Sequence, residues 1–273
     1  MSRKQIGICV YLWLLCVSSA AAQTPRLSNG RIEAHPTAGN FQREFQALAA
    51  KLTEPTWIGY TAPMIDGDHQ MCDWSDSWRS TPPPVTPAHL EPPDAFFVMF
   101  RIESSQVARI RSYSVDCPLD GGGRTVHWFT NVTPAESLAF LKTFVTSPVN
   151  KVADYAVTAI AMHDGVPALD TLIALAKDNP STKVRGNALF WLAKRAGQKA
   201  VGAISAAIEN DPDTEVKKKA VFALSQLPQD EGVPLLIQQA KTNKNAAVRK
   251  QAMFWLGQSK DPRALKFFEE ILR

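Results

Sequence analysis

The sequence predicts a mostly α-helical protein in which a C-terminal α-solenoid follows a small α+β domain. Three observations predict this fold class. Apolar residues recur every 32 positions over roughly the last 120 residues, short runs between 57 and 129 alternate apolar and polar side chains as strands do, and prolines crowd residues 82–93. We expect the α+β domain at 38–131 and the solenoid at 132–273, with units that begin near residues 152, 184, 216 and 248.

The first 22 residues have the pattern of a secretory signal peptide. Arg3 and Lys4 precede an apolar core from Ile6 to Val17, and Ala20 to Ala22 supply small residues for cleavage before Gln23. An uncleaved anchor helix is the alternative, although this core is shorter than the roughly 20 residues that span a bilayer. We expect an exported protein of a bacterial envelope, periplasmic or secreted, with a flexible polar leader at 23–37 and no membrane span after cleavage.

The charge of the chain argues against a nucleic-acid partner. The formal net charge is +4, and Arg3 and Lys4 of the signal contribute two of these charges. A mature chain so close to neutrality lacks the basic excess that phosphate backbones require.

The cysteines predict a disulfide. Cys9 and Cys16 leave with the signal, and only Cys72 and Cys117 remain. An even number of cysteines in an oxidising compartment favours a bond between them. A metal pair is the alternative, but no CxxC spacing is present.

The repeat is clearest in apolar columns that stay in phase without gaps. A valine at each unit's start is followed four residues later by alanine, and eight residues later by Ile or Leu. This spacing places the three side chains on one face of a helix. A second stripe predicts a second helix in each unit, and Gly-, Pro- or Asp-containing turns separate the two. The first columns are Val152, Val184, Val216, Val248 and Ala156, Ala188, Ala220, Ala252.

These units resemble the HEAT repeat family, in particular its short, lyase-type members. The segments that carry the resemblance are Val184–Ala193 and Val248–Gly257, together with the acidic lead-in at Asp211–Lys217. The resemblance covers the C-terminal half only. It implies helix–turn–helix units that must stack to bury their apolar faces, and a protein partner, because such repeats serve many binding functions.

An aromatic column is the first candidate binding surface. Large and small residues alternate in the column Ala159, Trp191, Ala223, Trp255, and Phe190, Phe222 and Phe254 each stand one place before the last three of these. Core packing between stacked units is one interpretation. The other is an exposed strip in which Trp191, Trp255, Phe190 and Phe254 anchor a protein or a peptide.

A basic column is the second candidate. Arg185, Lys217 and Arg249 each follow the first valine of their unit. They either pair with acidic groups on neighbouring turns, such as Asp178, Asp211 or Asp213, or form a basic stripe for an acidic partner. The mild basic excess of the repeats does not decide between these interpretations.

The N-terminal half predicts few elements of regular structure. Apolar spacing indicates helices at 38–52 and 134–146, and alternation indicates strands at 57–60, 96–103, 106–115 and 124–129. Gly121 to Gly123 predict a turn. The second helix would join the sheet to the repeats.

No catalytic motif is found, and we expect neither a cofactor nor a metal. The densest polar cluster is an acidic loop at 66–76, which contains Asp66, Asp68, His69, Asp73 and Asp76 without a known ligand spacing. The sequence therefore predicts an exported, non-enzymatic, protein-binding scaffold. The alternative is an enzyme or enzyme subunit with its site in this loop, and a third possibility is a scaffold that binds an acidic polymer.

Overall fold

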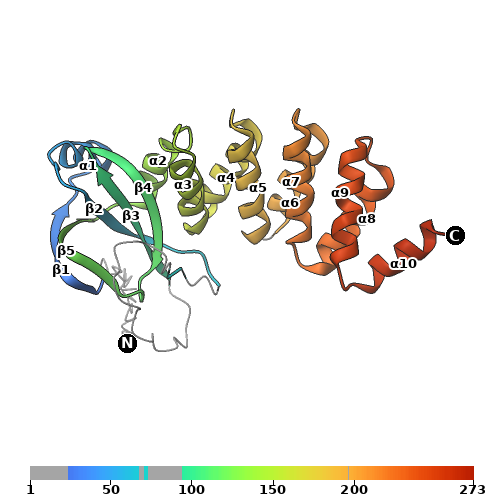
Figure 1. Cartoon of the computed structure of the whole chain (residues 1–273), viewed down its shortest axis with the longest axis horizontal. Helices are drawn as coiled ribbons and strands as arrows, with labels where there is room; N and C mark the ends of the chain where they lie inside the picture. The colour runs from blue at the N-terminus through green and yellow to red at the C-terminus, as the bar shows by residue number, and fades with distance from the viewer. Residues whose placement is uncertain (1–23, 68–70, 73–93, 196) are drawn as a thin grey trace, which may run out of the picture.

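The computed structural model describes residues 24–67, 71–72, 94–195 and 197–273. A mixed β-sheet with two helices lies at one end of the molecule, and pairs of helices follow one another along its long axis to the C-terminus (Figure 1). The expected signal at 1–22 lies outside the described residues. Among the helices that are described, none is both long and apolar enough to cross a bilayer.

Within the described ranges, five strands form one sheet in the order β1-β5-β2-β3-β4. The pairs β1–β5 and β5–β2 are parallel, whereas β2–β3 and β3–β4 are antiparallel. The expected strands are therefore present, but β2 and β5 are about twice as long as expected and β4 ends one residue earlier. The strands are β1 (Leu27–Pro36), β2 (Thr56–Pro63), β3 (Ala95–Glu103), β4 (Gln106–Ser114) and β5 (Leu119–Thr130).

Strand β1 corrects the expectation of a flexible leader at 23–37. Residues 27–36 pair in parallel with β5 along the edge of the sheet. Most side chains of β1 are exposed, so the segment is polar because it is an edge strand and not because it is unstructured.

The glycines of β5 form a bulge where the sequence predicts a turn. Gly122 and Gly123 have φ angles of 57° and 76°, a left-handed conformation that favours glycine. The register of β1 against β5 shifts between Ser28 and Gly30, so the extra residues of β5 loop out and pairing resumes at Arg124.

The two faces of the sheet bury separate sets of side chains. Helices α1 (Phe41–Ala49) and α2 (Pro134–Lys142) cover one face, where rings pack edge to face at centroid distances of about 5 Å. The rings on this face are Phe41, Phe45, Tyr60, Phe100, Phe129 and Phe140. The opposite face buries Trp57, Phe97, Met99, Tyr113 and Trp128.

Cys72 and Cys117 lie at bonding distance, with Cα atoms 5.5 Å apart, so the predicted disulfide is possible. Cys117 follows β4 and is buried in the second face of the sheet, where Cys72 packs against the same cluster. The pair ties the segment after β2 to the sheet.

A buried hydrogen-bonded chain joins the sheet to the first repeat helix. The Tyr60 hydroxyl lies 2.6 Å from Ser137 Oγ, which lies 2.7 Å from His163 Nε2. His163 Nδ1 lies 2.7 Å from the carbonyl oxygen of Ala159, which accepts only, so Nδ1 donates and Nε2 accepts from Ser137. The three side chains come from β2, α2 and the residue that follows α3 (Asn150–Met162), and each is at most 1% exposed. The junction is therefore a packed part of the core.

Eight helices of the described chain form the C-terminal part as successive pairs. The first helices of the pairs contact one another in the series α3, α5, α7 and α9, and α4 contacts α6. The valines of the first column are at most 2% exposed, as the repeat predicts. The helices are α3 (Asn150–Met162), α4 (Val166–Asp178), α5 (Thr182–Arg195), α6 (Gln198–Asn210), α7 (Thr214–Ser225), α8 (Gln229–Thr242), α9 (Ala246–Gln258) and α10 (Pro262–Ile271).

Short polar residues begin the later helices. The side chains of Asp213, Asn245 and Asp261 each accept a hydrogen bond from a backbone N–H in the first turn of α7, α9 and α10. Gly165 and Gly197 precede α4 and α6 with φ angles of 90° and 101°, which residues with a Cβ rarely adopt. These local signals place the helix starts where the sequence pattern predicts them.

Candidate functional site: an aromatic strip on the first helices

Five aromatic rings form a continuous strip across three successive first helices. Phe190 of α5 stacks on Phe222 of α7, with ring centroids 6.0 Å apart and planes 6° apart. Phe222 in turn contacts Trp255 of α9 at 4.9 Å. Trp191 and Phe254 extend the strip within α5 and α9, at 5.3 and 5.0 Å from the adjacent rings. The 32-residue spacing thus brings Phe190 onto Phe222, and the neighbouring column continues the strip from Phe222 to Trp255.

The side chains of the strip are partly packed and partly exposed. Ala159 and Ala223 are fully buried, and Trp191 and Trp255 pack partly against the core, as an alternation of large and small residues predicts. Phe254 is 54% exposed, however, and Phe190 and Phe222 are half-buried. The column therefore contributes to packing while the phenylalanine edge remains open to solvent.

A pocket lies beside the C-terminal end of the strip. It has a volume of about 380 Å³ and lies between α7, α8 and α9. Trp255 forms part of its wall, with apolar contributions from Leu227 and Val233 and a polar edge that includes Gln258 and Lys260. The indole N–H of Trp255 is buried and has no hydrogen-bond partner among the described residues. The pocket thus has a mixed lining, and Trp255, which forms part of it, contacts the exposed ring of Phe254.

Lysine side chains border the N-terminal part of the strip. Lys194 Nζ lies 5.7 Å from the ring centroid of Phe190, within the range of a cation–π contact. Lys219 of α7 packs its aliphatic stem over Gly186 of α5, where any Cβ would collide with that stem. Gly186 thereby leaves room for the Lys219 side chain between α5 and α7.

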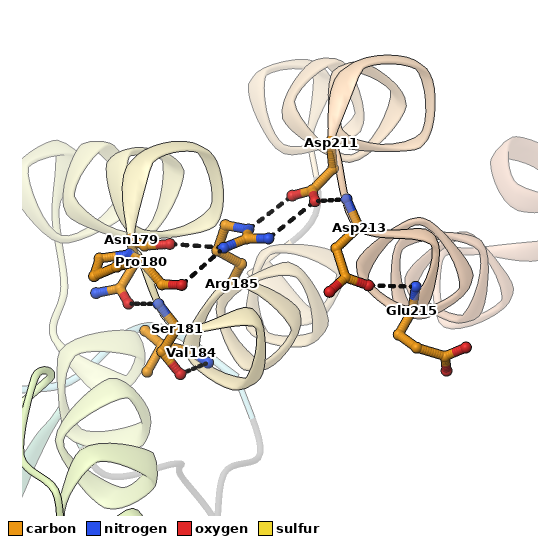
Figure 2. A network of polar contacts seen from close by, with 8 residues as sticks. All are labelled: Asn179, Pro180, Ser181, Val184, Arg185, Asp211, Asp213 and Glu215. Carbon is orange, nitrogen blue, oxygen red and sulfur yellow. Dashed lines mark hydrogen bonds and ion pairs between the residues drawn. The ribbon is translucent and has the colours of Figure 1, made fainter.

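The basic column has a structural role at Arg185 (Figure 2). Its guanidinium donates to Asp211 Oδ2 at 2.8 Å and Oδ1 at 3.0 Å, and Nη1 donates to the carbonyl oxygens of Asn179 and Pro180. The hydrogen bonds from Arg185 to Asp211 raise the pKa of the guanidinium. Arg185 is only 7% exposed, so its guanidinium is buried in this network and is not accessible to a partner.

The other two members of the column make simpler contacts. Lys217 Nζ donates to the carbonyl oxygen of Glu209 at 2.7 Å, and Arg249 donates to the carbonyl oxygens of Asn243 and Lys244. Both therefore bind carbonyl groups at the end of the preceding helix, where the helix dipole favours a positive charge. Pairing with an acidic group, one of the two interpretations for the whole column, is confirmed for Arg185.

The acidic loop at 66–76 falls outside the described part of the chain, apart from four of its residues. Asp66 is exposed, and Cys72 lies against Cys117. Asp68, His69, Asp73 and Asp76 belong to the stretches that are not described. The alternative of an enzymatic site in this loop therefore stays a prediction.

The sequence predicts Phe222 as a member of the aromatic column, though not as one of its anchors, and its ring contacts both Phe190 and Trp255. A second group is not predicted from the sequence. Glu33, His35 and His127 lie together on β1 and β5. The sequence offers no reason to connect them, because Glu33 and His35 fall in the segment that was expected to be a flexible leader.

Comparison with known proteins agrees with the repeat. The model of the HEAT repeats family matches residues 169–231 and 201–273. Among solved structures, human deoxyhypusine hydroxylase is 18% identical over 49% of this chain and 43% of its own, with a TM-score of 0.36. Phycocyanin lyase from Nostoc sp., a complex of CpcE and CpcF, is 18% identical over 50% of this chain and 89% of its own, with a TM-score of 0.38.

This chain thus spans less than half the length of the human structure. Comparison with curated proteins gave no match. The resemblance to HEAT repeats is confirmed by the family match alone, and it applies to the C-terminal half. Residues 169–273 of this protein are HEAT repeats.

Proposed function

We propose that the protein is an exported, non-enzymatic scaffold whose HEAT repeats form an α-solenoid that binds another protein or a peptide. The observation that carries the proposal is the aromatic strip, in which Phe254 is more than half exposed while its neighbours form an unbroken row of ring contacts. Aromatic side chains that are held rigidly and still reach solvent are typical anchors of protein interfaces.

The strip suits an amphipathic helix or an extended segment with spaced apolar side chains. Phe190, Phe222 and Phe254 recur once per unit across α5, α7 and α9, so a partner that crosses the three helices meets a ring at each step. The pocket beside Trp255 accepts one further apolar side chain. Binding of this kind buries the rings and needs no polar chemistry from the protein.

Affinity capture with the mature chain, residues 23–273, tests the proposal. Envelope extract is passed over the wild-type protein, Phe254→Ala and Leu265→Ala. Leu265 is the matched control because it is 64% exposed on α10 and belongs to no ring contact of the strip. We expect the captured partner to be lost with Phe254→Ala and retained with Leu265→Ala, and both variants to keep the thermal stability of the wild type.

Several outcomes would contradict the proposal. A partner retained equally by both variants would exclude the strip, and loss with both would indicate a non-specific apolar effect. Salt-sensitive binding of an acidic polymer by the wild type and by Phe254→Ala would favour the polymer-binding scaffold. Turnover by the purified protein would contradict the non-enzymatic part, and a mature N-terminus other than Gln23 would contradict the expected cleavage.

A further inference from the structure

Three side chains with metal-binding atoms converge on the helix-covered face of the sheet, at its β1 edge. The parallel register places Glu33 opposite His127 and His35 opposite Phe129. Since alternate residues of a strand share a face, Glu33, His35 and His127 all point to the same side as Phe129. Two of the three come from one strand and the third from its neighbour, so regular strand pairing holds the group together.

The distances among the three side chains match those of ligands that share one ion. His35 Nε2 lies 3.0 Å from His127 Nδ1 and 3.5 Å from Glu33 Oε1, and His127 Nδ1 lies 3.9 Å from Glu33 Oε2. Tetrahedral zinc binds nitrogen and oxygen at about 2.0–2.2 Å, which separates neighbouring ligand atoms by roughly 3.3–3.6 Å. The two Glu33 distances involve different carboxylate oxygens, and with one donor atom from each residue the three atoms lie within 4.8 Å of one another. Small rotations of the exposed Glu33 side chain are enough to bring them to the spacing of one tetrahedral face.

Hydrogen bonding alone accounts for only part of this arrangement. The 3.0 Å contact between the two imidazoles is a good hydrogen bond when one nitrogen carries the proton. The carboxylate contacts at 3.5 and 3.9 Å exceed hydrogen-bond lengths, yet the carboxylate still faces both imidazoles. An ion between the three groups satisfies all of them at once.

The group is held firmly on one side and open on the other. His127 is 8% exposed, and the ring of His35 packs on Phe129 with centroids 5.6 Å apart. The side chain of Glu33 is 57% exposed, so solvent reaches the group from the edge of the sheet. An ion can enter by this route, and a fourth coordination position would face water.

We propose that Glu33, His35 and His127 form a binding site for a divalent transition-metal ion, with Zn²⁺ as its best fit. Two neutral imidazoles and one carboxylate are ligands that Zn²⁺ prefers, and three protein ligands leave one position for water or for a ligand of a partner. The site is independent of the aromatic strip, which lies on α5, α7 and α9.

Zinc binding to the tag-free, chelator-treated mature chain tests the site, with its cysteines oxidised. Calorimetric titration with Zn²⁺ is expected to give one ion per chain. His35→Gln and Glu33→Gln should each weaken binding, His35→Gln by at least roughly 100-fold, since loss of a direct ligand exceeds the effect of an outer-shell change. Glu103→Gln is the matched control because Glu103 is an exposed carboxylate of the same sheet on β3.

The variants chosen are those most compatible with folding, because Glu33 and His35 are more exposed than His127. Melting curves without zinc verify the fold, and zinc should raise the melting temperature of the wild type and of Glu103→Gln only. Absence of zinc binding, or binding unchanged by His35→Gln, would overturn the proposal. Zinc binding that persists in His35→Gln but disappears in Cys117→Ala would place the ion at the cysteine pair and overturn it equally.

Discussion

The guanidinium of Arg185 in α5 is held by the carboxylate of Asp211, which stands 26 residues later, at the start of the turn into α7. The two side chains are 9% and 4% exposed, and the contact is bidentate. Asp211 Oδ1 also accepts the backbone N–H of Asp213. The pair therefore fixes one repeat unit to the turn that begins the next.

Asp211→Ala should destabilise the protein by about 3–5 kcal/mol. The substitution leaves the Arg185 charge buried without its partner, and this is more costly than the loss of the pair's own attraction. Urea denaturation at neutral pH measures the change in free energy of unfolding.

Asp213→Ala is the control for the same turn. Asp213 caps α7 by accepting the N–H of Glu215 at 2.7 Å, so its loss should cost only about 1 kcal/mol. Equal costs for the two variants would show that the ion pair contributes no more than a helix cap.

The sequence predicted the repeat well because its signal is periodic and local. The 32-residue columns identified the buried positions, and the turn residues identified the helix ends. The ion pair of Arg185 with Asp211 does not recur in the next unit, although the 32-residue period continues. The position equivalent to Asp211 is there Asn243, a neutral residue that cannot form an ion pair with Lys217. Arg249 repeats the contacts of Arg185 with the carbonyl oxygens five and six residues earlier, but the ion pair with Asp211 is particular to Arg185, which columns alone do not reveal.

His163 should make stability depend on pH between about 6.5 and 4. Burial, the largest cause, lowers the pKa of His163 to about 4 from its usual 6.5. The unfolded chain thus binds a proton that the folded chain does not, so this contribution is complete above pH 6.5 and decreases as the pH falls. Between pH 7.5 and pH 5 the loss should be about 2 kcal/mol.

Urea denaturation at these two pH values checks the effect in the wild type and in His163→Gln. The variant should be less stable at pH 7.5 but should lose less stability on acidification, because glutamine does not titrate. The prediction fails if the two proteins lose the same free energy between pH 7.5 and pH 5.

Gly59→Ala should destabilise the sheet by about 1–3 kcal/mol or more. Gly59 lies in β2, and a Cβ there would collide with Met99 Sδ and approach a ring carbon of Trp128 to 2.6 Å. Both neighbours are fully buried, so neither can move without disturbing the core. Thermal unfolding measures the loss.

Gly257→Ala supplies the opposite expectation. Gly257 lies in α9, and apart from its chain neighbours and the backbone of its own helix no described atom stands within 4 Å of the place that a Cβ would take, so alanine adds helix propensity without a collision. It should stabilise by up to about 1 kcal/mol. If Gly59→Ala behaved like Gly257→Ala, the described packing of Met99 and Trp128 over β2 would be wrong.

The pair Cys72 and Cys117 should contribute about 4 kcal/mol when oxidised. A bond between cysteines 45 residues apart restricts the unfolded chain by about this amount in the chain-entropy model. Denaturation with and without reductant measures it, and the Cys72→Ala/Cys117→Ala variant should match the reduced protein. Equal stability of the oxidised and reduced wild type would contradict the prediction.

The N-terminal part was harder to predict because its decisive contacts are remote in sequence. Nothing in the polar, mostly exposed segment 27–36 indicates that it pairs with β5, and the bulge at Gly122 and Gly123 has the composition of a simple turn. The convergence of His35 on His127 depends on this pairing. A strand's partner is set by the fold as a whole, whereas a helix face is set by residues three and four apart.

The parallel pairing of β1 with β5 also sets an order of events in folding. Leu27 stands opposite Leu119, so the edge of the sheet closes over a separation of 92 residues, while each HEAT unit contacts neighbours within about one period. Contacts of low sequence separation form quickly, and remote strand pairings form slowly. The repeats can therefore assemble from segments that are close in sequence. Strand β1, in contrast, can pair only after the chain has been synthesised as far as the end of β5.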